Sequence, residues 1–217
     1  MIHATSATLY SKTPIKDRYV LQVDLENAYN NISRSHFLTE TRKRFPSLSS
    51  WVEISYGTPS HLFFRGHRLS SSEGTKQGDP LGGILFGAGL HPIIEKINQK
   101  VPDLIAYQWI MDDGTVVGSL KDITTVVDIL TEDGPSKGLH LNQSKISIWV
   151  GEHFEDTPDP TGRGIPKADS RGIQLLGSPI RTNAFMLEVV ENASRRLKIA
   201  LSESCLPSKI PKSSSVC

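Results

Sequence analysis

The sequence has little of what marks a secreted or membrane-spanning chain. Only two of its 217 residues are cysteines, Cys205 and Cys217, and both lie in a polar tail, so neither a disulfide framework nor a zinc site is expected. The longest uncharged apolar stretch, residues 80–94, carries four glycines and two prolines in 15 residues. A membrane-spanning helix needs about 20 apolar residues. Because the first dozen residues also lack the apolar core of a secretory leader, we expect an intracellular protein, cytoplasmic or nuclear, with no membrane partner.

The chain has almost no net charge, with 24 Lys and Arg against 23 Asp and Glu, but the two signs are unevenly distributed. Residues 34–76 hold seven basic and three acidic side chains, whereas residues 101–160 hold three lysines and eleven acidic side chains. Two solvated surfaces of opposite sign would give this pattern, and so would a protein that holds a polyanion through bound cations. Charge alone favours the first interpretation.

The hydrophobic pattern predicts an α+β fold with a mostly antiparallel sheet. Short β-prone runs alternate with amphipathic segments, and Gly, Pro and Asp-Gly punctuate them. The expected strands are 19–23, a hairpin at 61–70 turning at Arg65-Gly66, 104–111, 115–119, one around Lys145, and a hairpin formed by 173–176 and the segment around Pro179. The expected helices are 34–44 capped by Ser33, 48–56, 80–96, 122–130 and 188–201.

Three carboxylates follow apolar strands. Asp24 ends the run YVLQV, and Asp112 and Asp113 follow the strand expected at 104–111. Asp-Asp-Gly is also ordinary turn chemistry, and taken alone it favours a structural turn. If the two strands are neighbours, however, the three carboxylates converge at one edge and repel one another unless a cation lies among them. Such hard oxygen ligands suit Mg²⁺, and two ions together can activate a hydroxyl and stabilise a pyrophosphate leaving group.

Five motifs place these acids in a wider pattern. In chain order they are VDLENAYNNISR (23–34), GTKQGDPLGGILFGAGLHPII (74–94), WIMDDGTVVG (109–118), GLHLNQSKISI (138–148) and QLLGSPI (174–180). Together they resemble the palm motifs of reverse transcriptases, above all those of non-LTR retrotransposons, over residues 19–180. The blocks containing KQGDPL and DDG are the most specific parts of this resemblance.

The resemblance implies an RNA-directed DNA polymerase that joins a dNTP to a primer 3′-hydroxyl on an RNA or DNA template. Asp24 and Asp112 would hold two Mg²⁺ ions, for which Mn²⁺ can substitute. Asp113 would assist, and the backbone carbonyl of Leu25 would be a further ligand. The implied fold is a reverse-transcriptase palm, with helices packed on one face of the sheet.

The resemblance also implies substrate contacts. Tyr29 would lie under the nucleotide sugar and exclude a 2′-hydroxyl, although a core aromatic residue would also suit its position. Gln77 and Gly78 would touch the template and the incoming nucleotide, where glycine lets the backbone approach closely. Lys145 would act near the pyrophosphate as a cation or general acid. Without the motifs, Gln77 is an ordinary loop amide and Lys145 a lysine whose stem covers a strand.

Two further contacts concern the nucleic acid strands. Leu176 and Gly177 would form the hairpin that grips the primer end, or else an ordinary turn. Arg65 and Arg68 would meet backbone phosphates, which gives binding that is independent of sequence and sensitive to salt.

The chain departs from the family pattern in places. Ile110 stands where the family has Tyr or Phe, and Lys76 replaces the commoner Arg. Only 23 residues precede Asp24 and 37 follow Ile180, so we expect a truncated fragment whose fingers and thumb are largely missing. The expected division is an N-terminal remnant (1–18), the palm (19–180), and an amphipathic helix with a polar tail (181–217). Two functions remain open: a reverse transcriptase, or an inactive retroelement remnant that at most binds nucleic acid weakly.

Overall fold

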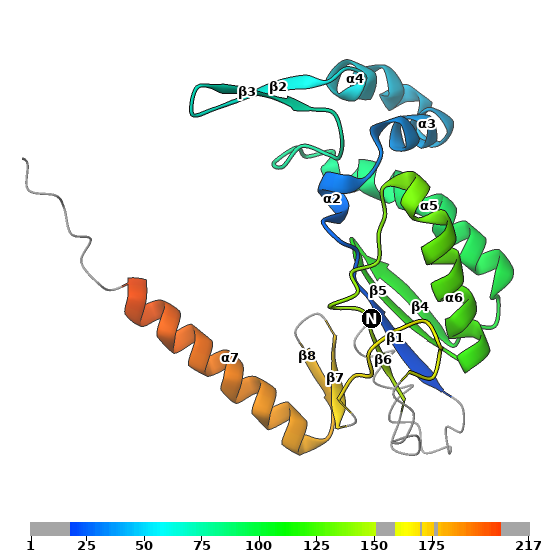
Figure 1. The fold of residues 1–217 in the computed structure, drawn as a ribbon, viewed down its shortest axis with the longest axis vertical. Helices are drawn as coiled ribbons and strands as arrows, with labels where there is room; N and C mark the ends of the chain where they lie inside the picture. The colour runs from blue at the N-terminus through cyan, green and yellow to red at the C-terminus, as the bar shows by residue number, and fades with distance from the viewer. Residues whose placement is uncertain (1–17, 151–158, 170, 176–177, 205–217) are drawn as a thin grey trace, which may run out of the picture.

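A four-stranded antiparallel sheet forms the centre of the molecule (Figure 1). The computed structural model describes residues 18–150, 159–169, 171–175 and 178–204. In the sheet the strand order is β4-β5-β1-β6. The strands are β1 (Tyr19–Val23), β4 (Ala106–Ile110), β5 (Asp113–Gly118) and β6 (Ser147–Trp149).

Strand β1 lies between two strands that are far from it in sequence. Its register with β5 runs from Tyr19 opposite Gly118 to Val23 opposite Gly114, and Leu21 lies opposite Ile148 of β6. Val20 and Leu21 point to opposite faces of the sheet, and both are fully buried. A central strand that is covered on both faces needs a continuous apolar run, which explains the sequence YVLQV.

Helices cover one face of the sheet, as expected. Helices α5 (Gly82–Lys100) and α6 (Leu120–Asp133) lie against it, and α3 (Arg34–Arg44) and α4 (Pro46–Tyr56) continue this layer at one end (Figure 1). The main hydrophobic core lies between the sheet and these helices. The glycines of α5 allow close packing, because a Cβ at Gly89 would lie 2.5 Å from Cδ1 of the buried Ile32.

A small hairpin covers part of the opposite face. It consists of β7 (Gly172–Leu175) and β8 (Ser178–Arg181), which pair antiparallel. A second, smaller core lies there, made of Val20, Val117, Trp149, Ile173 and Ile180. The sequence analysis expected helices on one face of the sheet and did not place this hairpin on the other. The hairpin packs there through Ile173 of β7 and Ile180 of β8, which belong to the smaller core.

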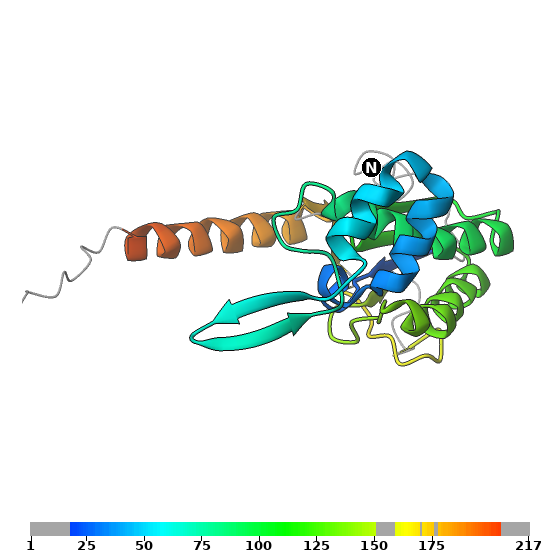
Figure 2. The ribbon, with the colours of Figure 1, turned by 90° about the horizontal axis from the view of Figure 1, so that it is seen from above.

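Two elements project from the body of the molecule. The hairpin of β2 (Ser60–Phe64) and β3 (His67–Ser71) extends from one end, and α7 (Asn183–Ser204) extends from the other. Figure 2 shows both pointing in the same general direction, so the outline in Figure 1 is a C that is open on one side. The short helices α2 (Ala28–Asn31) and η1 (Pro135–Lys137) complete the fold. No helix in the described ranges is long and apolar enough to cross a bilayer.

Several element boundaries differ from the expected ones. Helix α4 begins at Pro46 and not at 48, because proline suits the first helical turn. Helix α6 begins at Leu120, because Ser119 and Asp122 form a capping box. Helix α7 begins at Asn183, five residues before the expected start.

Two differences affect the candidate site. The expected turn at Asp112-Asp113-Gly114 is wrong, because Ile110 pairs with Asp113 and the turn consists of Met111 and Asp112. Met111 takes the left-handed conformation there, with φ of 58°. The strand expected within residues 139–150, around Lys145, is present but begins two residues later, as β6 at Ser147.

Candidate active site

The three candidate carboxylates come from the same end of two neighbouring strands. Asp24 directly follows β1, Asp113 is the first residue of β5, and Asp112 lies in the turn before it. Because Val23 lies opposite Gly114, the next position of this register sets Asp24 opposite Asp113. The topology therefore brings the acids to one edge although they are far apart in sequence.

The carboxylates act on one another electrostatically. Burial raises the pKa of Asp113 above its usual range, and the negative charges of Asp112 and Asp24 raise it further, while Lys145 works in the opposite direction. A carboxyl group whose pKa is raised by like charges binds its proton more tightly and equally favours a bound cation. The edge is therefore a place where positive charge stabilises the fold.

The carboxylate oxygens at this edge are ligands of the type that Mg²⁺ prefers, but they do not enclose an ion. In the described ranges no group of three or more His, Cys, Asp or Glu side chains is arranged to hold a metal. Mg²⁺ keeps several waters and takes oxygens from substrate phosphates, so one or two carboxylates suffice in such open sites. The residues fit a metal that is completed by substrate rather than one enclosed by the protein.

The Leu25 carbonyl is directed toward the same edge. Leu25 forms an isolated antiparallel bridge with Leu141, in which the Glu26 N–H donates to the His140 carbonyl and the Asn142 N–H donates to the Asp24 carbonyl. In such a pair the bonds of the flanking residues face the partner, so the N–H and C=O of Leu25 point the other way. That direction is the β5 side of β1, where Asp112 and Asp113 lie.

An amide that had no role in the sequence-based hypothesis holds Asp24 in place. Nδ2 of Asn142 donates to Oδ1 of Asp24 at 2.8 Å, and the Ser144 hydroxyl donates to Oδ1 of Asn142 at 2.7 Å. The Ser144 N–H also donates to Oδ1 of Asn142, at 3.2 Å, and because an N–H can only donate, this bond fixes which end of the amide faces the carboxylate. Asn142 belongs to the motif GLHLNQSKISI, in which the sequence analysis gave a role only to Lys145.

Lys145 forms an ion pair with the first carboxylate. Its Nζ lies 3.4 Å from Oδ2 of Asp24, and its side chain is two-thirds exposed. The turn formed by residues 143–145, which precedes β6, directs Lys145 toward the acids. Exposed pairs of this kind contribute about 0–1 kcal/mol to stability, so Lys145 is loosely held.

Tyr29 connects α2, α5 and the β4–β5 turn. Its ring stacks on Phe86 with centroids 4.5 Å apart, and its hydroxyl lies 2.8 Å from Sδ of Met111. Burial raises the pKa of the Tyr29 hydroxyl, and the nearby charge of Asp112 raises it further. The ring is half-buried rather than a core residue, and sequence reasoning missed both Met111 and Phe86 as its neighbours.

The loop that carries Gln77 and Gly78 is attached to α2. The Thr75 N–H donates to the Tyr29 carbonyl at 2.7 Å, which places the loop beside Tyr29. Gln77 and Gly78 are both exposed, and Gly78 has φ of 84° with nothing near the position of an added Cβ. The glycine is needed for its backbone conformation and leaves open space above the loop.

Buried polar side chains support this loop from below. The Arg34 guanidinium donates to the carbonyls of Ser71 and Gly74, and the Tyr56 hydroxyl donates to Asp79. Burial raises the pKa of Tyr56 to about 12, and the Asp79 hydrogen bond adds to this effect. Sequence reasoning missed the supporting roles of Arg34, Tyr56 and Asp79. In the sequence, Arg34 and Tyr56 look like ordinary helix residues.

The remaining candidate residues lie elsewhere. Arg65 and Arg68 belong to the projecting β2–β3 hairpin and not to the edge that carries the acids (Figure 1). Leu176 and Gly177 lie outside the described residues.

Comparisons with known proteins agree with the fold. Solved telomerases share the fold at low sequence identity. The apo telomerase of Candida tropicalis matches with a TM-score of 0.60 and 13% identity over 83% of this chain and 34% of that one. Telomerase of Candida albicans in complex with the TWJ fragment of telomeric RNA matches with a TM-score of 0.58 and 14% identity over 83% of this chain and 31% of that one. The chain thus spans about a third of these telomerases.

Sequence comparison gives a narrower assignment. No curated protein matches the sequence. The model of one protein family matches residues 2–191, which include all five motifs and every element from β1 to β8. The chain therefore belongs to the reverse transcriptase (RNA-dependent DNA polymerase) family.

Proposed function

We propose that this chain is the catalytic part of a retroelement reverse transcriptase of the non-LTR type. Its reaction would be transfer of a nucleotide from a dNTP to a primer 3′-hydroxyl, with RNA or DNA as template. The observation that supports this most is the meeting of Asp24, Asp112 and Asp113 at one sheet edge in a chain of this family. Tyr29 and the loop with Gln77 adjoin that edge.

Two divalent ions, Mg²⁺ or Mn²⁺, would be held by Asp24, Asp112 and Asp113 with the Leu25 carbonyl. When bound, they supply the charge that activates the hydroxyl and stabilises the leaving group. Asn142 keeps the Asp24 carboxylate directed toward the edge through its 2.8 Å hydrogen bond. Lys145 neutralises Asp24 until the ions bind, and its exposed ammonium is then available to the pyrophosphate.

The substrate would contact the ring and the loop beside the acids. Tyr29 is held by Phe86 and Met111, so a nucleotide sugar lying over it would meet a ring with little freedom to move. An extra 2′-hydroxyl would then be rejected sterically. The open space above Gly78 lets a sugar or base approach the backbone there.

Primer extension tests this proposal. The chain is incubated with a homopolymer RNA template, a complementary DNA primer, Mg²⁺ and the matching dNTP. The matched control is a chain with Asp112→Ala and Asp113→Ala. Extension by the unmodified chain and none by the control would support the proposal, because the control lacks two of the three carboxylates that would hold the ions.

A second candidate is an inactive retroelement remnant that at most binds nucleic acid weakly. What favours it is that the acids of the described residues do not enclose a metal, while Lys145 already pairs with Asp24. This candidate expects primer extension at background by both the unmodified chain and the control. Extension that depends on Asp112 and Asp113 rejects it.

A further inference from the structure

The β2–β3 hairpin has features that the proposed reaction does not explain. It forms a two-stranded sheet of its own, and every side chain from His61 to Ser70 is exposed. Phe63 is 78% exposed, Phe64 59% and Leu62 53%. Isolated two-stranded hairpins are marginally stable in water, so exposed rings on one are more readily explained by binding than by folding.

The two faces of the hairpin differ in chemistry. Successive side chains of a strand point to opposite faces, so the strand pairing assigns each residue to one of them. The Phe63 face consists of His61, Phe63, Arg68 and Ser70. The Phe64 face consists of Leu62, Phe64, His67 and Leu69.

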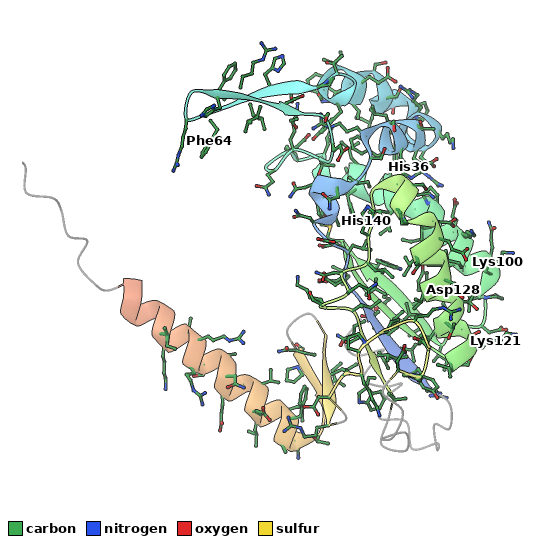
Figure 3. The ribbon with its side chains drawn as sticks, viewed as in Figure 1. His36, Phe64, Lys100, Lys121, Asp128 and His140 are labelled. Carbon is green, nitrogen blue, oxygen red and sulfur yellow. The ribbon has the colours of Figure 1, made fainter. Side chains whose placement is uncertain are left out.

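A cation accompanies the ring on the Phe63 face. Phe63 lies directly opposite Arg68, whose guanidinium contacts Nε2 of His61. On the other face, Leu62 and Leu69 lie opposite each other, and the Arg65 guanidinium already lies over the Phe64 ring at 5.2 Å. Figure 3 shows Phe64 near the tip of the hairpin. The Phe63 face therefore combines an exposed ring with a positive charge on the opposite strand, whereas the Phe64 ring is already covered by the Arg65 guanidinium.

The charge of the segment indicates the kind of partner. Residues 60–72 contain two arginines and two histidines but no aspartate or glutamate. A polyanion is attracted to such a segment, and its phosphates pair with the arginines. Exposed aromatic rings beside such cations stack with the unpaired bases of single strands, whereas bases inside a duplex are stacked on one another.

We propose that the Phe63 face binds single-stranded nucleic acid, with a base stacked on Phe63 and the adjoining phosphate on Arg68. The proposal rests on the proposed function only in identifying that strand as the template. It adds a binding site on the hairpin, separate from the sheet edge that carries the acids. A protein partner would instead use the Phe64 face, where Leu62 and Leu69 lie opposite each other.

A matched pair of variants tests this proposal. Phe63→Ala and Phe64→Ala remove the same ring from opposite faces of one hairpin, and both positions are exposed. Binding is measured by fluorescence anisotropy with a labelled oligouridylate of about 12 nucleotides, a length within the usual range for such sites. EDTA is present and dNTP absent, so the acids play no part. Circular dichroism confirms that both variants are folded.

We expect Phe63→Ala to weaken binding by about 5- to 150-fold, the loss that corresponds to one stacked base. Phe64→Ala should change it by less than about 2-fold, within the scatter expected for a side chain that does not contact the strand. With an abasic strand of the same length, Phe63→Ala should have no effect, while Arg68→Gln should weaken binding of both strands. Equal losses in the two Phe variants, a Phe63→Ala loss that persists on the abasic strand, or no binding by the unmodified chain would overturn the proposal.

The control with Asp112→Ala and Asp113→Ala separates this proposal from the proposed function. It should bind the oligouridylate as the unmodified chain does. Primer extension that fails while binding still depends on Phe63 rejects only the proposed function. Binding that is insensitive to Phe63 while extension depends on the acids rejects only the hairpin site.

Discussion

Asn142 shows how a single amide shapes the charge at the candidate site. Its Nδ2 donates to Oδ1 of Asp24, and the Ser144 hydroxyl holds the opposite end of the amide. The carboxylate of Asp24 thus has two partners, one neutral donor and the cation of Lys145. Removing the donor leaves the carboxylate less constrained, whereas replacing it with a carboxylate adds a like charge.

The change Asn142→Asp tests this arrangement. A second carboxylate would then stand 2.8 Å from Oδ1 of Asp24, where a donor stood before. Since hydrogen bonds to charged groups contribute about 1.5–3 kcal/mol, we expect a loss of that size or more in the free energy of unfolding at pH 7. Urea unfolding in EDTA measures it.

The matched control is Asn142→Ala, which removes the donor without adding charge. At pH 7 this variant should lose less free energy of unfolding than Asn142→Asp does. In acid, where the new carboxylate is protonated, the two variants should lose similar amounts. Equal stability of Asn142→Asp and the unmodified chain would show that the amide does not hold Asp24 in solution.

At the scale of elements, helix α5 depends on close packing at one glycine and not at another. An added Cβ at Gly89 would lie 2.5 Å from Cδ1 of Ile32, whereas an added Cβ at Gly87 meets nothing within 4 Å. Ile32 is fully buried, so any shift of its Cδ1 would disturb the close-packed core around it. Alanine is favoured over glycine in a helix by about 1 kcal/mol where space allows.

We therefore expect opposite effects from Gly87→Ala and Gly89→Ala. The first should raise the free energy of unfolding by about 1 kcal/mol through helix propensity alone. The second should lower it by about 1–3 kcal/mol, because the new methyl group overpacks the core. Thermal melting monitored by circular dichroism measures both. Stabilisation of similar size in the two variants would contradict the close contact at Gly89.

The loop beside β6 depends on one aspartate, and this gives it a pH dependence. Burial alone would raise the pKa of Asp159, but donors from Thr161 and Gly164 outweigh burial and hold the pKa of this carboxyl below its usual value. The folded state therefore releases the proton more readily than the unfolded state. The stabilisation is complete above the ordinary aspartate range and is lost as the pH falls through the lowered value.

Replacing Asp159 with Ala should thus cost stability at neutral pH and not in acid. We expect a loss of about 1–3 kcal/mol at pH 7, because the loop N–H groups lose their acceptor. The difference from the unmodified chain should shrink as the pH drops below the ordinary aspartate value. Urea unfolding across this pH range checks the trend, and a loss that stays constant with pH would contradict it.

The sequence predicted helices and strands better than it predicted turns and the side-chain hydrogen bonds that support the candidate site. The run YVLQV and the capped helix at 34–44 were predicted with the bounds that the structure has, since a buried strand and a Ser N-cap leave local signals. The turn at Met111 and Asp112 was not, because Asp-Gly is a stronger hairpin signal than a left-handed methionine. The contacts of Asn142 and Tyr56 arise only from tertiary packing, so no local pattern indicates them.

At the scale of the whole molecule, the sheet edge lies between two projecting elements. The β2–β3 hairpin and α7 extend on the same side of the body, and the C-shaped outline opens between them (Figure 1). Basic residues 34–76 belong to the end that carries the hairpin, while the acids lie on the central sheet. Of the other acidic residues in 101–160, Asp122, Asp128, Glu132 and Asp133 lie on α6 and not at this edge.

The central claim is that the three carboxylates form a metal-dependent site, and thermal melting with and without Mg²⁺ or Mn²⁺ tests it most directly. Ligand at 100 times its dissociation constant stabilises a protein by about 2.7 kcal/mol, which is about 5–10 °C for a domain of this size. We expect such a rise for the unmodified chain. In Asp112→Asn we expect a higher melting temperature without metal, because one repelling charge is gone, and a smaller rise with it. An equal rise in both chains would contradict the assignment of the site.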